Sequence, residues 1–125
     1  MKRSARLRLH DILDAIEGIE ATVGEAGFAA YARNWTMRRA VERGIEIISE
    51  ASRHLPDELK AQYPRVYWQE IAAIGNLLRH EYGRIDDRIM WRVVQKYLPE
   101  LKTVVLDMQR RSAQANEKGG RSRSQ

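Results

Sequence analysis

Apolar residues recur at helical spacing along most of the chain. Leucine and isoleucine at positions i, i+3 and i+4 predict a first helix over about residues 7–23, and a short helical turn follows at residues 28–31. A second helix, capped by Asn34 or Thr36, should run to about His54. The first half of the chain is therefore expected to form two long helices joined by a short one.

The helical period continues in the second half. After a short turn at residues 57–62, a third helix is predicted over about residues 66–82, with Gly83 as its left-handed cap. The stripe of this helix that should face the core contains Trp68, Ile71, Ala72, Gly75 and Leu78.

A long fourth helix should begin at Asp86 or Asp87 and run to about Arg111. Pro99 lies inside it and has no backbone N–H, so it must kink the helix or split it into two.

No segment shows the two-residue period of a strand. These elements predict an all-α fold, a four- to five-helix up-down bundle. The many apolar residues of the last helix are typical of a bundle that pairs as a symmetric homodimer.

Basic residues are concentrated at the two ends of the chain, whose formal net charge is +5 over 125 residues. Residues 2–8 carry four Lys or Arg, and residues 110–125 carry five against one Glu, which leaves a net charge of −3 for residues 9–109. The ends could touch RNA or could be solvated tails. Residues 112–125 have no apolar side chain larger than alanine, so we predict a helical domain over residues 1–111 and a disordered basic tail after it.

The composition excludes several classes of site. The chain has no cysteine, which rules out a disulfide framework, a thiolate metal site and a cysteine nucleophile. Its three histidines are scattered and no HExxH motif occurs, so we predict neither a metal nor a cofactor. No apolar run is long enough to span a bilayer, and the basic N-terminal segment leads into an amphipathic pattern instead of a signal-peptide core. We therefore expect a soluble cytoplasmic protein without a membrane partner.

The stretch that carries the most chemistry is residues 74–83, at the predicted end of the third helix. His80 has the side chain that takes up and releases protons near neutral pH. Arg79 and Arg84 offer planar, permanent charges that suit a phosphate, and Tyr82 has a hydroxyl that can be modified. The same residues could equally form an ordinary basic turn on the surface.

Three segments carry a resemblance to a known family: residues 9–20, 40–56 and 64–98. In order and spacing they resemble the HepT-like proteins of the HEPN superfamily, over about residues 8–108. The resemblance implies an all-helical dimer that acts as the toxin of a type VII toxin–antitoxin pair and cleaves RNA without metal. It also implies a partner, a minimal nucleotidyltransferase antitoxin called MntA. In that family the antitoxin silences the nuclease by transferring AMP from ATP onto the tyrosine of an Arg-x4-His-x-Tyr motif.

The motif can be carried over residue by residue. The motif histidine is His80, the modified tyrosine is Tyr82, and Asn76 matches the polar residue that usually follows the motif arginine. The arginine itself is missing, because Gly75 stands five positions before His80. An arginine at that position would stabilise the charged phosphorane during in-line attack.

Arg79 is the nearest substitute for the missing arginine, although on a helix it points roughly 100° away from its neighbour His80. Arg84 is a second candidate. Two functions remain open. The first is a ribonuclease toxin that is silenced by AMP transfer onto Tyr82 and whose catalytic residues are His80, Arg79, Arg84 and Asn76. The second is a non-catalytic helical protein that binds a minimal nucleotidyltransferase and presents Tyr82 to it.

Overall fold

Helices make up nearly all of the part of the chain that the structure describes. The structure is a computed structural model, which describes the backbone of residues 1–80 and 85–123 and the side chains up to residue 115. Its elements are α1 (Arg3–Val23), α2 (Phe28–Arg33), α3 (Trp35–Arg53), α4 (Asp57–Ala61), α5 (Trp68–His80), α6 (Asp87–Arg92), the π-helical turn η1 (Val93–Tyr97) and α7 (Leu98–Arg123). No strand occurs among these residues, so the all-α prediction is confirmed.

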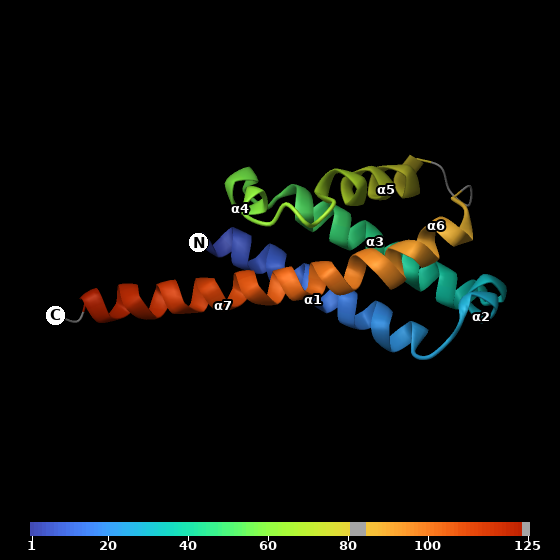
Figure 1. The fold of residues 1–125 in the computed structure, drawn as a ribbon, viewed down its shortest axis with the longest axis horizontal. Coiled ribbons are helices and arrows are strands. Elements are labelled where there is room, and N and C mark those ends of the chain that lie inside the picture. The colour runs from blue at the N-terminus through green and yellow to red at the C-terminus, as the bar shows by residue number, and fades with distance from the viewer. Residues whose placement is uncertain (81–84, 124–125) are drawn as a thin grey trace.

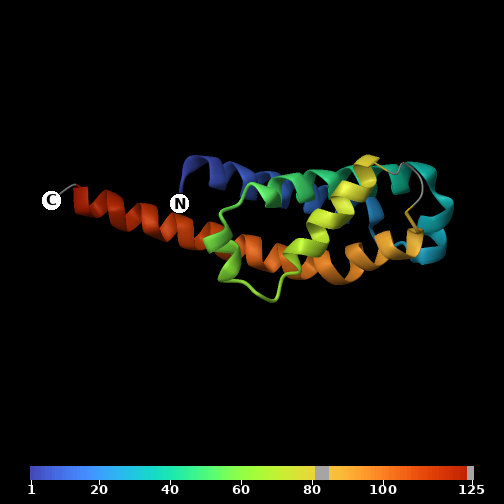
Figure 2. The ribbon, with the colours of Figure 1, turned by 90° about the horizontal axis from the view of Figure 1, so that it is seen from above.

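The long helices alternate in direction, as Figures 1 and 2 show: α1 runs one way, α3 returns, α5 follows the direction of α1, and the α6–η1–α7 segment returns again. The central helix is α3, which packs against α1 on one side and against α5 on the other, while α7 packs along α1. The predicted up-down bundle is therefore confirmed.

The capping residues settle two boundaries that the sequence left open. The side chain of Asn34 accepts a hydrogen bond from the backbone N–H of Met37 at 2.9 Å, so Asn34 and not Thr36 caps α3. The side chain of Asp86 accepts one from the N–H of Arg88 at 2.8 Å and caps α6. The predicted cap of α5, Gly83, lies outside the described residues.

Pro99 acts on the fourth helix through a change of helical type. The π-helical turn η1 ends directly before it, and the N–H of Leu98 donates to the carbonyl of Val93, five residues earlier. A π turn inserts one extra residue into the helix, and prolines and π turns are both places where the regular hydrogen-bond pattern of a helix is interrupted. The predicted interruption is therefore present, as the turn that joins α6 to α7.

The end of the last helix differs from the sequence-based prediction. We expected the helix to end near Arg111, whereas helical backbone continues to Arg123 (Figure 1). Ser112 is buried, so packing against the body supports the helix beyond Arg111. Extending an existing helix costs far less than nucleating one, and the sequence Ala-Gln-Ala that follows Ser112 consists of good helix formers.

The core runs the length of the bundle and contains the apolar stripes of every long helix. Its largest fully buried side chains are Tyr31, Leu9, Ile12, Ile16, Ile45, Ile48, Met90, Leu101 and Met108. Trp68 and Trp91 are partly buried against this core, as expected, and the ring centroid of Trp91 lies 5.1 Å from that of Tyr31. This aromatic contact ties α2 to α6 at one end of the bundle.

Candidate functional site

The candidate residues that the structure describes lie in the last two turns of α5. Asn76 and His80 are exposed, and the side chain of Arg79 is 36% exposed. Because Asn76 and Arg79 are three positions apart they share one face of the helix, and Nη2 of Arg79 donates to Oδ1 of Asn76 at 3.2 Å. The structure therefore joins two of the predicted catalytic residues in one hydrogen bond.

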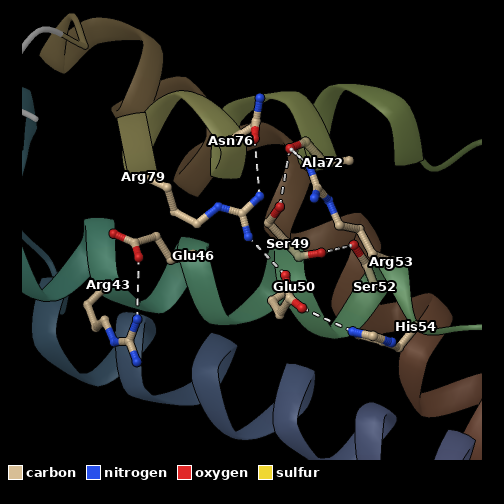
Figure 3. Close-up of polar contacts among 10 residues, drawn as sticks. All are labelled: Arg43, Glu46, Ser49, Glu50, Ser52, Arg53, His54, Ala72, Asn76 and Arg79. Atoms are coloured by element: carbon tan, nitrogen blue, oxygen red, sulfur yellow. Dashed lines mark hydrogen bonds and ion pairs between the residues drawn. The ribbon is translucent and has the colours of Figure 1, made fainter. Parts of the chain in front are cut away.

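A carboxylate that the sequence did not single out completes this group. Nη1 of Arg79 donates to Oε2 of Glu50 at 2.9 Å, and the other oxygen of Glu50 lies 3.0 Å from Nε2 of His54 (Figure 3). The spacing of Glu50 and His54 predicts their contact, but no local pattern connects Glu50 with a residue 29 positions away.

Glu50 is a permanent counter-ion for Arg79 near neutral pH. Hydrogen bonds from His54 first and from Arg79 second hold the pKa of the Glu50 carboxyl below its usual range. Both side chains of the Glu50–Arg79 pair remain accessible to water, so the ion pair contributes little to stability, on the order of 0–1 kcal/mol. Its effect is to hold the guanidinium against the surface that α3 and α5 share.

The position of the missing motif arginine is closed by helix packing. Gly75 is buried where α5 crosses α3, and a Cβ atom at this position would lie 2.0 Å from Oγ and 2.2 Å from Cβ of Ser49. Ser49 is itself 1% exposed, and its hydroxyl donates to the carbonyl of Ala72 at 3.3 Å. A side chain of any size at residue 75 would force the two helices apart. Glycine at this position is therefore a packing requirement of this chain. The sequence placed Gly75 on the core-facing stripe of its helix, but it did not show the close approach to Ser49.

The remaining predicted residues are only partly placed. Arg79 extends from α5 toward Glu50 on α3 (Figure 3), and no contact between Arg79 and His80 is described. His80 has no hydrogen-bond partner among the described residues. Tyr82 and Arg84 lie outside those residues. The structure thus brings Asn76, Arg79 and Glu50 together and places His80 at the exposed end of the same helix.

Across residues 1–80 and 85–115, no three histidine or carboxylate side chains gather closely enough to hold a metal ion. In the same part of the chain, no helix combines the length and the apolar character that crossing a membrane requires.

Comparison with known proteins gives a single family. The profile described as "HepT-like: Ribonuclease HepT-like" matches residues 12–108. A probable ribonuclease HepT of Thermococcus cleftensis is 38% identical over 102 residues, which cover 82% of this chain and 93% of that protein. A putative RNase of Methanocaldococcus jannaschii is 32% identical over 104 residues, 83% of this chain and 95% of that protein. A putative RNase of Caldanaerobacter subterraneus is 33% identical over 106 residues, 85% and 95% of the two chains. No solved structure matches the chain significantly.

Proposed function

Because the chain belongs to the ribonuclease HepT-like family, we propose that it is a metal-independent endoribonuclease, the toxin of a type VII toxin–antitoxin pair. The observation that carries the proposal is the group at the end of α5, where Glu50 and Asn76 hold the guanidinium of Arg79 on the surface and the exposed His80 is the next residue of the helix. The relatives named as ribonucleases support RNA as the substrate.

The proposed reaction is an in-line transfer at phosphorus. The 2′-oxygen of the RNA forms a bond to the adjacent phosphorus while the bond from phosphorus to the 5′-oxygen breaks. One group takes the proton of the 2′-hydroxyl and another protonates the leaving 5′-oxygen. In a twofold dimer His80 of one subunit could supply the base and the same residue of the partner the acid. A nearby cation would stabilise the negative charge of the intermediate.

Arg79 is the described residue that best suits the role of that cation. It lies four positions after Gly75, one helical turn along, and so projects from the same face of α5 as the absent motif arginine. Its bonds to Glu50 and Asn76 use only part of its N–H donors. A phosphate oxygen can therefore bind the same guanidinium while Glu50 and Asn76 hold it in place.

The surface around this group also suits a homodimer, which we include in the proposal. Ile47 on α3 is 36% exposed and Leu77 on α5 is 44% exposed, although both are large and apolar. Ile47 lies three positions before Glu50 on α3, and Leu77 directly follows Asn76 on α5. Burying them against a second copy would bring two groups of this kind into one cleft.

Substituting Arg79 tests the catalytic role directly. Arg79→Ala should remove about 2–4 kcal/mol of transition-state stabilisation, and kcat/KM for RNA cleavage should fall accordingly. Arg53→Ala is the matched control, because Arg53 also reaches from α3 to α5, where it donates to the carbonyl of Ala72 at 3.3 Å. Cleavage is measured on labelled RNA with EDTA present.

A second variant separates catalysis from structure. Glu50→Gln removes the charge of the Arg79 counter-ion but keeps the guanidinium, so it should reduce cleavage far less than Arg79→Ala. Equal losses from the two substitutions would mean that only the ion pair matters. No loss from Arg79→Ala, with the role resting instead on Arg84, would also contradict the assignment of Arg79.

Gly75 in place of the motif arginine favours a second candidate function, a non-catalytic helical protein that binds a minimal nucleotidyltransferase. The two functions differ in what the protein does alone. Expression without the partner should stop growth and degrade RNA if the chain is a toxin, and should do neither if it only binds. Normal growth with undegraded RNA would favour the second function.

The proposal includes regulation by a covalent modification of Tyr82. Incubation with the cognate MntA-like nucleotidyltransferase, ATP and magnesium should add AMP to Tyr82, with pyrophosphate as the leaving group. The adduct would place a bulky anion beside His80 and exclude RNA by charge and by size. Mass spectrometry of the peptide that contains Tyr82 should show the added mass, and Tyr82→Phe should accept none.

Tyr67 provides the most demanding control for this modification, because it is 50% exposed whereas Tyr31 is fully buried. Tyr67→Phe should be modified as fully as the parent protein. An adduct on Tyr67 instead of Tyr82, or no adduct with an active partner, would contradict the proposal.

A further inference from the structure

A second basic surface lies away from the end of α5. A hollow of about 780 Å³ opens between the loop that follows α4 and the middle of α7, and we refer to it as the α4–α7 groove. Its charged, aromatic and exposed apolar lining residues are Tyr63, Arg65, Leu106, Asp107, Arg110 and Arg111. Arg110 and Arg111 belong to the basic C-terminal segment, and Arg65 from the loop after α4 lines the same hollow, so three arginines gather at one place.

Positive charge exceeds negative charge in the α4–α7 groove. The side chains of Arg65, Arg110 and Arg111 are 80%, 69% and 61% exposed. Asp107 is the one carboxylate among the described residues that line the groove, and it is shared by Arg110 and Arg111. Glu100 lies 4.0 Å from Arg65 but outside the lining. At least one guanidinium charge therefore remains uncompensated and open to solvent.

Asp107 holds two of the three arginines of the groove, Arg110 and Arg111, in a fixed arrangement. It accepts a hydrogen bond from the hydroxyl of Tyr63 at 2.6 Å, pairs with Nε of Arg111 at 3.2 Å and is bonded by Arg110. The hydroxyl of Tyr63 is also the main reason why the pKa of Asp107 is lowered, so the carboxylate is ionised near neutral pH. Arg111 in turn lies 5.5 Å from the centroid of the Tyr63 ring. The cations are thus positioned before any ligand arrives, which lowers the entropy cost of binding.

We propose that the α4–α7 groove binds the phosphate backbone of single-stranded RNA. Planar guanidinium groups suit phosphates, and the groove sets them beside an aromatic ring and the 46% exposed side chain of Leu106, against which a base can pack. An acidic peptide would use the arginines but would gain less from an aromatic and apolar wall. The choice of RNA as ligand rests on the proposed function, whereas the existence of an anion site does not.

The loop of residues 62–65 that lines the groove comes just before the first residue of α5, Trp68, whereas His80 is the last residue of α5. The 13 residues of α5 span about 20 Å. A strand that reaches both places must therefore be several nucleotides long, and a dinucleotide can occupy only one of them. The α4–α7 groove would act as a site that retains long RNA while cleavage occurs elsewhere.

The test is the binding of a fluorescent single-stranded RNA in which every 2′-hydroxyl is methylated. This RNA cannot be cut. Arg110→Gln should weaken binding roughly threefold to tenfold and, per lost phosphate contact, lower the slope of log K against log salt by about 0.7. The double variant Arg110→Gln/Arg111→Gln should lose more. Arg43→Gln is the matched control, since Arg43 is 71% exposed and also pairs with a carboxylate three positions away. Circular dichroism confirms that each variant is folded.

Equal affinity of the parent protein and the double variant would overturn the inference. An equal loss of RNA affinity in Arg43→Gln would also overturn it. So would a protein that binds polyglutamate through these arginines but does not bind RNA. Cleavage assays separate this inference from the proposed function. The double variant should lower kcat/KM for long RNA and leave a dinucleotide substrate unaffected. If the parent protein cleaves nothing yet binds RNA through Arg110 and Arg111, the nuclease proposal fails and the groove stands.

Discussion

Replacing His80 with alanine should reduce RNA cleavage by about a hundredfold to ten-thousandfold, the range expected when a general acid or base is removed. His80 is exposed and makes no described contact, so the substitution should leave the fold intact. Cleavage is measured on labelled RNA in EDTA, because the proposed reaction needs no metal. Circular dichroism and light scattering report the helical content and the oligomeric state.

His54→Ala is the matched control for this substitution. His54 is also an exposed histidine, at the C-cap of α3, but its imidazole is bonded to Glu50 at 3.0 Å. Cleavage by His54→Ala should stay within about threefold of the parent protein, because the nearest group it affects is a counter-ion and not a proton carrier. If His80→Ala cleaves as fast as the parent, the catalytic assignment is wrong. Equal losses from both histidines would point to a general effect of surface charge.

Gly75→Ala should lower the free energy of unfolding by about 1–3 kcal/mol, the usual cost of inserting a methyl group into a packed interior. The added Cβ would meet Ser49 at 2.0–2.2 Å, and Ser49 is buried between the two helices. Gly18→Ala is the matched control: Gly18 is exposed in α1 and a Cβ there meets nothing within 4 Å. That substitution should raise stability by about 1 kcal/mol, because alanine is the better helix former. Urea unfolding measures both.

A second substitution identifies the contact responsible. Adding Ser49→Gly to Gly75→Ala removes the atoms that the new methyl group meets, so the double variant should recover part of the loss despite the cost of a further helical glycine. Gly75→Arg, which restores the family motif, should destabilise more than Gly75→Ala and should not improve cleavage. A fully stable Gly75→Ala protein would contradict the close approach of α3 and α5.

The helices of this protein follow from local chemistry, which is why their order and the candidate residues for two of their caps could be predicted from the sequence. Asn34 and Asp86 cap helices because their short polar side chains reach backbone N–H groups two or three residues away. Pro99 interrupts its helix because it lacks a donor. Each of these effects acts within a few residues, so the pattern along the chain contains it. The end of α7 was missed because propagation of a helix depends on what precedes it.

The sequence by itself determined the all-helical bundle, the family and the segment around His80 as the place to look for chemistry. Only the tertiary structure decided how Arg79 is held and why residue 75 is glycine. Both answers depend on contacts between α3 and α5, and neither helix shows them alone: Glu50 meets Arg79 across 29 positions, and Gly75 meets Ser49 where the helices cross. Helical periodicity determines which face of a helix is buried, but the depth and angle at which two faces meet are set by the packing of the whole core.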